Sequence, residues 1–224
     1  MKQEIFSGNN SIKKVFIGFL ILLIGLGGGN AIFSYAYWYF NLSEKIPKEL
    51  MPSIYLLLII AAMLLSNSYL LFSLRMFPKI INKSFKESLI TGLSGIALLW
   101  ISMLILTLAF FRGKSNDIFI QTLTKLPAPY FYISIMLVTV VSPLFEEVLM
   151  RGFFFELLRR KWNIGISLCV TLLFATIIHY KLGIEVIPII IFNIIFTFLY
   201  VEGGLLSSIL GHMFVNYYVS YVIN

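Results

Sequence analysis

Long apolar runs, separated by short polar segments, dominate the chain. Each run is continuous, whereas a membrane-spanning β-strand alternates apolar and polar residues. Only helices and closed barrels satisfy every backbone hydrogen bond inside a bilayer. The pattern therefore predicts an all-α, polytopic transmembrane helical bundle of about seven spans, in a range of six to eight. The expected spans are roughly 15–40, 54–74, 88–111, 129–154, 164–180, 184–200 and 204–222.

Composition supports the same class. The chain is 59% hydrophobic and 12% charged, whereas soluble domains carry about 25% charged residues. This apolar excess is too large to bury in one water-soluble core, so we expect an integral membrane protein in contact with the lipid bilayer. No soluble domain or repeat interrupts the pattern, and residues 1–224 are expected to form a single membrane domain.

The net charge of +7 comes from 17 Lys and Arg against 10 Asp and Glu. Basic loops tend to stay on the cytoplasmic side of a membrane. Threading seven spans with the N-terminus inside places ten basic residues inside and six outside, with Arg151 left in its span. We therefore expect a cytoplasmic N-terminus. A clustered basic surface is absent, so a nucleic-acid partner is not expected.

Two adjacent acids, Glu146 and Glu147, interrupt the fourth apolar run, with Arg151 just downstream. Ionisable groups inside a membrane are costly and usually functional. Glu147 and Arg151 are four residues apart, so they are expected to form an ion pair on one helix face. Adjacent helix residues point about 100° apart, which leaves Glu146 available for chemistry. A purely structural charge cluster is the alternative, but one arginine does not neutralise two acids.

The chain has two histidines, and both lie in later apolar runs. Glu146 and His179 are equally far from the turn between their spans, sixteen residues from Trp162 and Asn163 respectively. Glu146 lies ~15 Å inside a hydrocarbon core of ~30 Å. His212 lies eight residues beyond the last turn, or ~12 Å inward. The acid and both histidines are therefore expected at similar depth on three helices.

His212 and Asn216 are four residues apart and share a helix face. Together they could donate two hydrogen bonds to a developing oxyanion, or bind a metal ion or a buried water. Taken alone, a buried histidine or an interhelical asparagine contact explains this pair equally well. The depth shared with the acid pair favours chemistry.

Other polar residues of the spans suggest packing instead. Ser142, Asn67 and Asn193 are expected to make helix–helix contacts. Pro143 precedes the acid pair, and a proline inside a helix removes a hydrogen-bond donor. We therefore expect Pro143 to kink the fourth span and to free backbone carbonyls near the site.

These residues resemble the motifs of the CPBP family of intramembrane proteases. The family is also called Abi or CAAX-protease-like, and it includes the eukaryotic type II CAAX prenyl protease. Its Glu-Glu-x-x-x-Arg motif matches residues 146–151, and its His-x-x-x-Asn motif matches residues 212–216. The usual Phe-x-x-x-His motif is altered here, because Ala175 stands four residues before His179 and Phe174 lies one step earlier. The resemblance covers about residues 129–220, which would form the catalytic core.

The resemblance implies roles for the motif residues. Glu146 and His179 would activate the attacking water, while His212 and Asn216 would stabilise the oxyanion. The supporting residues Glu147 and Arg151 would organise the helix.

Metal dependence is left open by the sequence. Four side chains could contribute to a Zn²⁺ site with an open position for water. A metal-free mechanism by general base and oxyanion hole is the other possibility, and His-Glu-x-x-His spacing is absent. The candidate ligands are Glu146, Glu147, His179 and His212.

The sequence therefore predicts an intramembrane endopeptidase that cleaves a membrane-associated peptide or protein. The family resemblance suggests a bacterial cell membrane and roles in peptide processing, CAAX processing or bacteriocin immunity. The main alternative is a non-catalytic bacteriocin-immunity or scaffold membrane protein of the same fold. A small proton-coupled carrier is less well supported, because the paired halves common in transporters are not visible.

Overall fold

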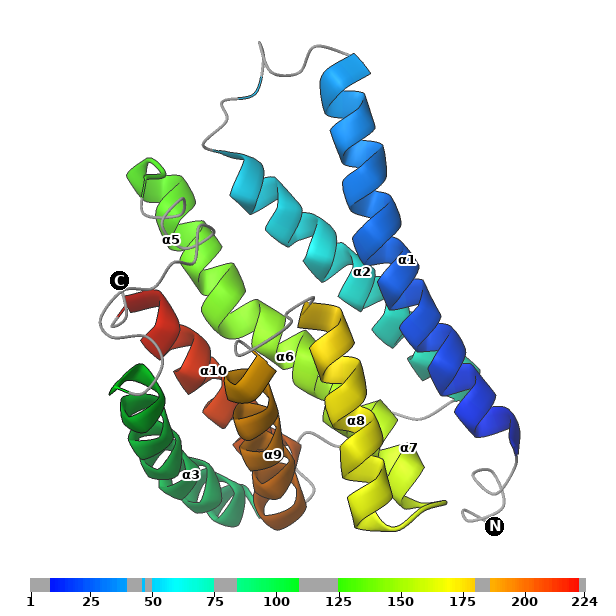
Figure 1. Ribbon diagram of the computed structural model, residues 1–224, viewed down its shortest axis with the longest axis vertical. Coiled ribbons are helices and arrows are strands. Elements are labelled where there is room, and N and C mark those ends of the chain that lie inside the picture. The colour runs from blue at the N-terminus through cyan, green and yellow to red at the C-terminus, as the bar shows by residue number, and fades with distance from the viewer. Residues whose placement is uncertain are drawn as a thin grey trace.

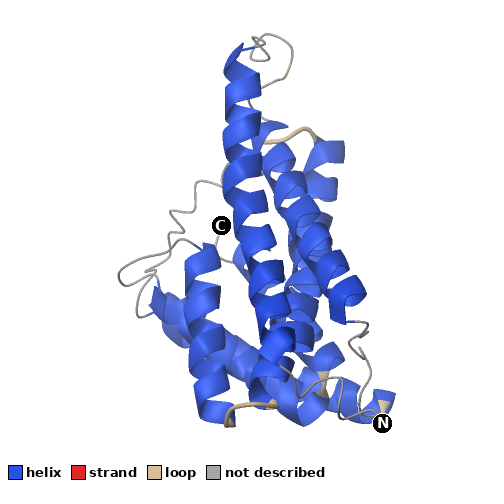
Figure 2. Cartoon of the chain, turned by 90° about the vertical axis from the view of Figure 1, so that its right-hand side faces the viewer, coloured by secondary structure: helices blue, strands red, loops and turns tan. Residues whose placement is uncertain are grey.

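The computed structural model describes residues 9–39, 46, 50–74, 84–108, 125–179 and 186–221. In these ranges the chain is helical and contains no strand (Figures 1 and 2). When elements that follow without a break are joined, seven helical segments result, which confirms the predicted helical bundle. The segments are α1 (Asn9–Tyr39), α2 (Met51–Leu74), α3 (Phe85–Leu106), the run from α5 to α7 (Ala128–Arg159), α8 (Ile164–His179), α9 (Val186–Gly203) and α10 (Leu205–Tyr221).

Five of these segments are long and apolar enough to cross a membrane, and α8 is a shorter apolar helix. Their apolar side chains divide between contacts with neighbouring helices and the outer surface, where many large ones are exposed. Lipid tails would cover such a surface at no hydrophobic cost. The protein is therefore an integral membrane protein.

The fourth segment is longer and less regular than expected. It consists of α5 (Ala128–Met136), η5 (Leu137–Val141), α6 (Ser142–Glu147), η6 (Val148–Phe155) and α7 (Glu156–Arg159), in which η5 and η6 are π-helical. The predicted end near residue 154 is too early, because Glu156 pairs with Arg159 and Arg160 one turn later. These pairs satisfy polar groups at the helix end, so the helix continues to Arg159.

Pro143 removes one backbone hydrogen-bond donor from η5. In this π turn the Ser142 N–H donates to the Leu137 carbonyl, five residues back. The next donor in the same pattern would be the N–H of Pro143, which proline lacks. The Val138 carbonyl therefore has no donor from that position, as the sequence predicted for this region.

Two glycines have a structural role in the bundle, one in helix packing and one in a turn. A Cβ atom on Gly25 of α1 would lie 2.6 Å from the Ala62 Cβ atom of α2, so only glycine allows α1 and α2 to pack this closely. The turn between α9 and α10 uses Gly204, whose φ of 84° is readily adopted only by glycine. Its N–H donates to the Tyr200 carbonyl and ends α9.

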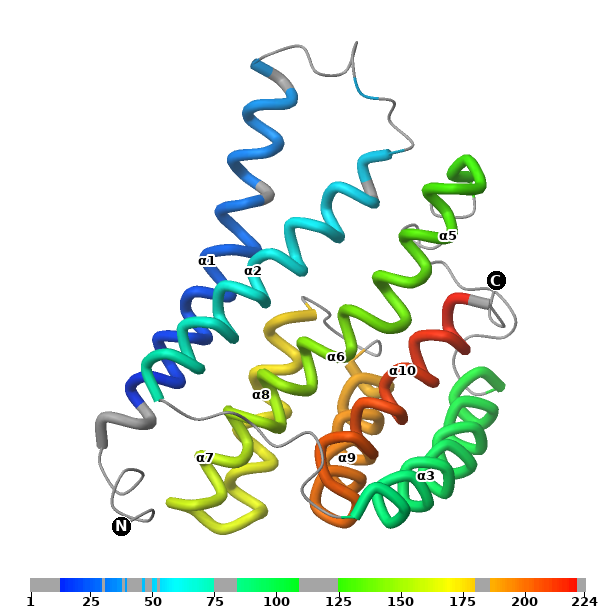
Figure 3. The backbone as a smooth tube through the Cα atoms, turned by 180° about the vertical axis from the view of Figure 1, so that it is seen from behind, coloured from blue at the N-terminus to red at the C-terminus, as the bar shows by residue number. Residues whose placement is uncertain are grey.

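Helix α10 occupies a central position. It packs against α3, α9, α6 and η5, and its orange-red ribbon lies next to the green α6 (Figures 1 and 3). Helix α3 covers α9 and α10 from the other side. The acid pair on α6 and the His–Asn pair on α10 are therefore brought face to face.

Candidate active site

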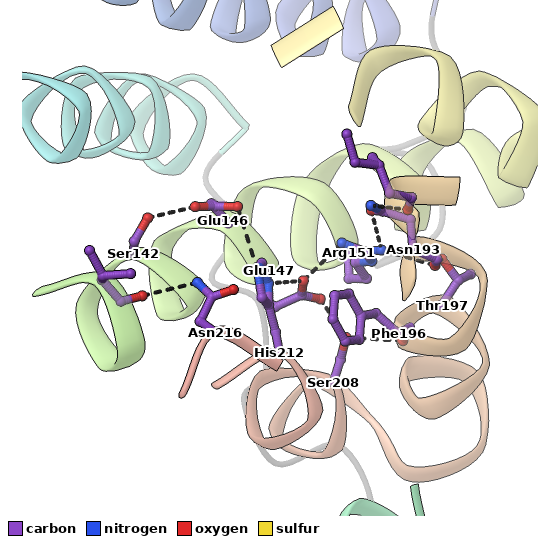
Figure 4. A network of polar contacts seen from close by, with 12 residues as sticks. Ser142, Glu146, Glu147, Arg151, Asn193, Phe196, Thr197, Ser208, His212 and Asn216 are labelled. Carbon is purple, nitrogen blue, oxygen red and sulfur yellow. Dashed lines mark hydrogen bonds and ion pairs between the residues drawn. The ribbon is translucent and has the colours of Figure 1, made fainter. Parts of the chain in front are cut away.

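Glu147 is the centre of a buried polar network (Figure 4). Its side chain is fully buried. One carboxylate oxygen, Oε1, accepts hydrogen bonds from Arg151 Nη1 and from the Nδ1 side of His212, each at 2.8 Å. The other oxygen, Oε2, accepts a short hydrogen bond from the Ser208 hydroxyl. A carboxylate with this many partners is held rigidly and is not free to move toward a substrate.

Arg151 is buried beside Glu147, and the ion pair predicted from their spacing is present. The Arg151 Nη2 group also donates to Asn193 of α9, at 2.7 Å to Oδ1 and 3.0 Å to the backbone carbonyl. Asn193 therefore makes the helix–helix contact predicted for it. These bonds tie η6 to α9.

His212 is fixed on two sides. Its ring stacks on Phe196 of α9, with 4.7 Å between ring centroids and 19° between planes. The guanidinium carbon of Arg151 lies 5.5 Å from the centroid of the same phenyl ring. With Nδ1 anchored on Glu147, the ring turns its other nitrogen, Nε2, toward Glu146.

Glu146 is the more accessible acid of the pair, with 18% of its side chain exposed. Its Oε1 atom accepts a hydrogen bond of 2.5 Å from the Ser142 hydroxyl, one helical turn earlier. Its Oε2 atom lies 3.8 Å from His212 Nε2. That separation is too long for a direct hydrogen bond. One oxygen of Glu146 is thus held, and the other faces the imidazole across a short gap.

Asn216 lies one turn beyond His212 on α10, as expected, and the side chain is half-buried. Its Nδ2 group donates to the Val138 carbonyl at 3.0 Å, which is the carbonyl that Pro143 leaves without its π-helical donor. One hydrogen of the amide group is therefore used to fix the side chain. Within the described ranges, no acceptor is bound to the second hydrogen of Nδ2.

His179 is the last residue of α8, and its side chain is exposed. Helix α8 packs against η6, the segment that follows the acid pair. The two residues of the altered motif before this histidine are well packed. Phe174 joins an aromatic cluster with Phe19 and Phe154, and Ala175 is buried. Participation of His179 in the site stays a prediction.

Three site residues were not identified from the sequence. Ser142 was expected to make a helix–helix contact, but it binds Glu146 within its own helix. Ser208 and Phe196 hold Glu147 and the His212 ring. The serines could have been found by spacing, since Ser142 precedes Glu146 by four residues and Ser208 precedes His212 by four. Phe196 has no comparable signal.

Without His179, the donor atoms that converge here are too few for a catalytic zinc ion. Both oxygens of Glu147 and the Nδ1 side of His212 are already engaged in the network. Glu146 Oε2 and His212 Nε2 remain, which is one protein ligand fewer than the three of catalytic zinc sites. Across the described residues, no three His, Cys, Asp or Glu side chains converge as a metal site requires.

Comparison with known proteins finds a family model that matches the part of the chain that holds the site. The family model described as Type II CAAX prenyl endopeptidase Rce1-like matches residues 128–218, the range that holds the acid pair, Arg151, both histidines and Asn216. Comparison with curated proteins and with solved structures finds no match. The family match confirms the resemblance drawn from the sequence motifs. Residues 128–218 of this chain are therefore similar to the Type II CAAX prenyl endopeptidase Rce1-like family.

Proposed function

We propose that this protein is an intramembrane endopeptidase that hydrolyses a peptide bond in a membrane-associated peptide or protein. The observation that carries the proposal is the pair of atoms Glu146 Oε2 and His212 Nε2, which face each other at 3.8 Å. A water molecule can hydrogen-bond to both atoms at that separation. Each side chain is held by its other polar atom, so the pair is preorganised around the water.

Charge balance suggests how His212 acts. Glu146, Glu147 and Arg151 together carry one uncompensated negative charge, which is costly in a membrane interior. His212 lies between the two acids, with Nδ1 bonded to Glu147 and Nε2 facing Glu146. In the form that carries a hydrogen on both ring nitrogens, Nδ1–H donates to Glu147 and Nε2–H can donate to an oxyanion.

The proposed reaction proceeds in two steps. Glu146 takes a proton from the water, whose oxygen attacks the carbonyl carbon of the scissile peptide bond. The oxyanion accepts hydrogen bonds from His212 Nε2 and from the second N–H of Asn216 Nδ2. The intermediate then collapses, the C–N bond breaks, and Glu146 returns the proton to the leaving amine. We propose that His179, at the end of α8, assists the activation of water, as the family motif implies.

Substrate access follows from the predicted topology. We propose a cytoplasmic N-terminus, supported by the ten-to-six distribution of basic residues, and entry from the cytoplasmic side or laterally from the bilayer. Because the matched family is described as a prenyl endopeptidase, lipid-anchored C-terminal peptides belong among the substrates to be tested.

Hydrolysis can be tested directly with the purified protein in lipid nanodiscs. A library of transmembrane and lipid-anchored peptides is incubated in ¹⁸O-labelled water, and the products are identified by mass spectrometry. We expect shortened peptides with ¹⁸O in the new terminal carboxylate. Peptides that are captured intact and never cleaved would favour the non-catalytic immunity or scaffold role.

We expect cleavage to continue unchanged in the presence of a zinc chelator, because no three His, Cys, Asp or Glu side chains converge in the part of the chain that the structure describes. The measurement is the cleavage rate before and after dialysis against the chelator. A loss of activity that added Zn²⁺ restores would show that a metal participates.

Replacing Ser142 with alanine should lower kcat about tenfold or more. The hydroxyl holds Glu146 Oε1, and hydrogen bonds to charged groups are worth ~1.5–3 kcal/mol. A matched control is Thr139→Val, which deletes a similar bond to the Ile135 carbonyl in the same segment. Equal losses in both variants would show that Ser142 has no special relation to Glu146.

A further inference from the structure

Asn67 of α2 lies outside the family-matched range but contacts the helix that carries the acid pair. Helix α2 packs against α6 and η6. The Asn67 side chain is buried, and its Nδ2 group donates to the Met63 carbonyl at 2.9 Å and to the Phe145 carbonyl at 3.3 Å. Of these two bonds, the one to Phe145 crosses between helices.

The Phe145 carbonyl belongs to the peptide group that joins Phe145 to Glu146. It lies where α6 gives way to the π-helical η6, and the Val148 N–H is shared there between the Leu144 and Phe145 carbonyls. A shared donor holds a carbonyl less firmly than a dedicated one. The bond from Asn67 therefore restrains the backbone directly before the proposed general base.

The Asn67 side chain is not explained by stability alone. With both hydrogens of Nδ2 directed at carbonyls, its Oδ1 atom is buried without a hydrogen-bond partner in the part of the chain that the structure describes. A buried acceptor without a donor is destabilising, and an apolar side chain of similar size avoids that cost. A residue selected only for packing would be apolar here.

We propose that Asn67 is a positioning residue, by which α2 sets the backbone of Glu146 relative to His212. The expected effect on kcat rests on the proposed proteolytic function. The bond between Asn67 and the Phe145 carbonyl does not depend on that function. Ser142 holds the Glu146 carboxylate, and Asn67 holds the peptide group that leads into the same residue. Together the two bonds define where Glu146 Oε2 lies.

The test compares Asn67→Leu with Ser66→Ala in the full-length protein. Ser66 is the neighbouring buried residue of α2, and its hydroxyl donates to the Gly18 carbonyl of α1, away from the site. We expect Asn67→Leu to lower kcat about 10–100-fold with KM unchanged, because a small misplacement of a reacting group has an effect of this size. Ser66→Ala should keep the wild-type kcat.

Hydrogen exchange measured by mass spectrometry supplies a readout that needs no cleavage. Asn67→Leu should accelerate amide exchange in residues 142–150, whereas Ser66→Ala should leave this segment unchanged. Unchanged exchange in Asn67→Leu, or equal acceleration and equal loss of kcat in both variants, overturns the proposal. If the wild-type protein cleaves nothing, the proposed function fails, and exchange alone still decides whether Asn67 restrains this segment.

Discussion

Glu146→Gln should reduce kcat by about 10²–10⁴-fold, the range expected for loss of a general base. Glutamine has nearly the same shape, and its Oε1 atom can still accept the hydrogen bond from Ser142. The amide cannot take a proton from water, so the chemical step fails while the fold persists. The measurement is the rate of peptide cleavage in nanodiscs, with thermal unfolding recorded on the same samples.

A matched control for this change is Glu202→Gln. Glu202 is an exposed glutamate near the end of α9, so the same chemical replacement there should leave cleavage at the wild-type rate. Wild-type processing by Glu146→Gln would mean that this carboxylate is not the base. The non-catalytic immunity or scaffold role would then become the better account of the site.

Much of the fold could be predicted because its signals are local. Apolar run length identified the seven helical segments that the structure describes, and the four-residue spacing identified the ion pair between Glu147 and Arg151. Because proline has no N–H group, the sequence also predicted a backbone carbonyl near Pro143 without its helical donor. The structure shows that the Val138 carbonyl accepts a hydrogen bond from Asn216 instead. Each of these features depends on residues within one helix turn or on the bilayer thickness.

The partner of His212 could not be predicted in the same way. The sequence suggested that Glu147 pairs with Arg151, and the structure shows that the carboxylate also anchors His212 Nδ1 and Ser208. Which acid faces which ring nitrogen depends on how α6 and α10 are rotated about their axes. The π-helical segments η5 and η6 change the rotation of α6 about its axis. No periodicity in the sequence predicted these segments.

The π-helical segments also affect the depth argument. That estimate assumed ~1.5 Å of rise for every residue of a straight α-helix, whereas a π turn contains an extra residue. Glu146 and His212 nevertheless meet, because both lie on helices packed directly against each other. Whether His179 also reaches the site does not follow from depth. His179 is the last residue of α8, and its depth along the helix axis does not determine the direction of its side chain.

Arg151→Met should lower the free energy of unfolding by about 3–5 kcal/mol, the usual cost of breaking a buried ion pair from one side. Glu147 would stay fully buried with its main counter-charge removed, and Asn193 Oδ1 would lose its donor. Methionine fills much of the same volume, so the loss is electrostatic more than steric. The measurement is reversible unfolding in mixed detergent micelles, followed by tryptophan fluorescence or circular dichroism.

Arg159→Met provides the contrast. Arg159 pairs with Glu156 at 2.6 Å, but 36% of its side chain is exposed. Such surface pairs contribute ~0–1 kcal/mol, and Glu156 would keep Arg160 and Tyr200 as partners. The double variant Glu147→Gln/Arg151→Met should recover part of the stability lost in Arg151→Met, because no uncompensated charge is then buried. A loss in Arg151→Met no larger than in Arg159→Met would show that the Glu147 network does not hold the bundle together.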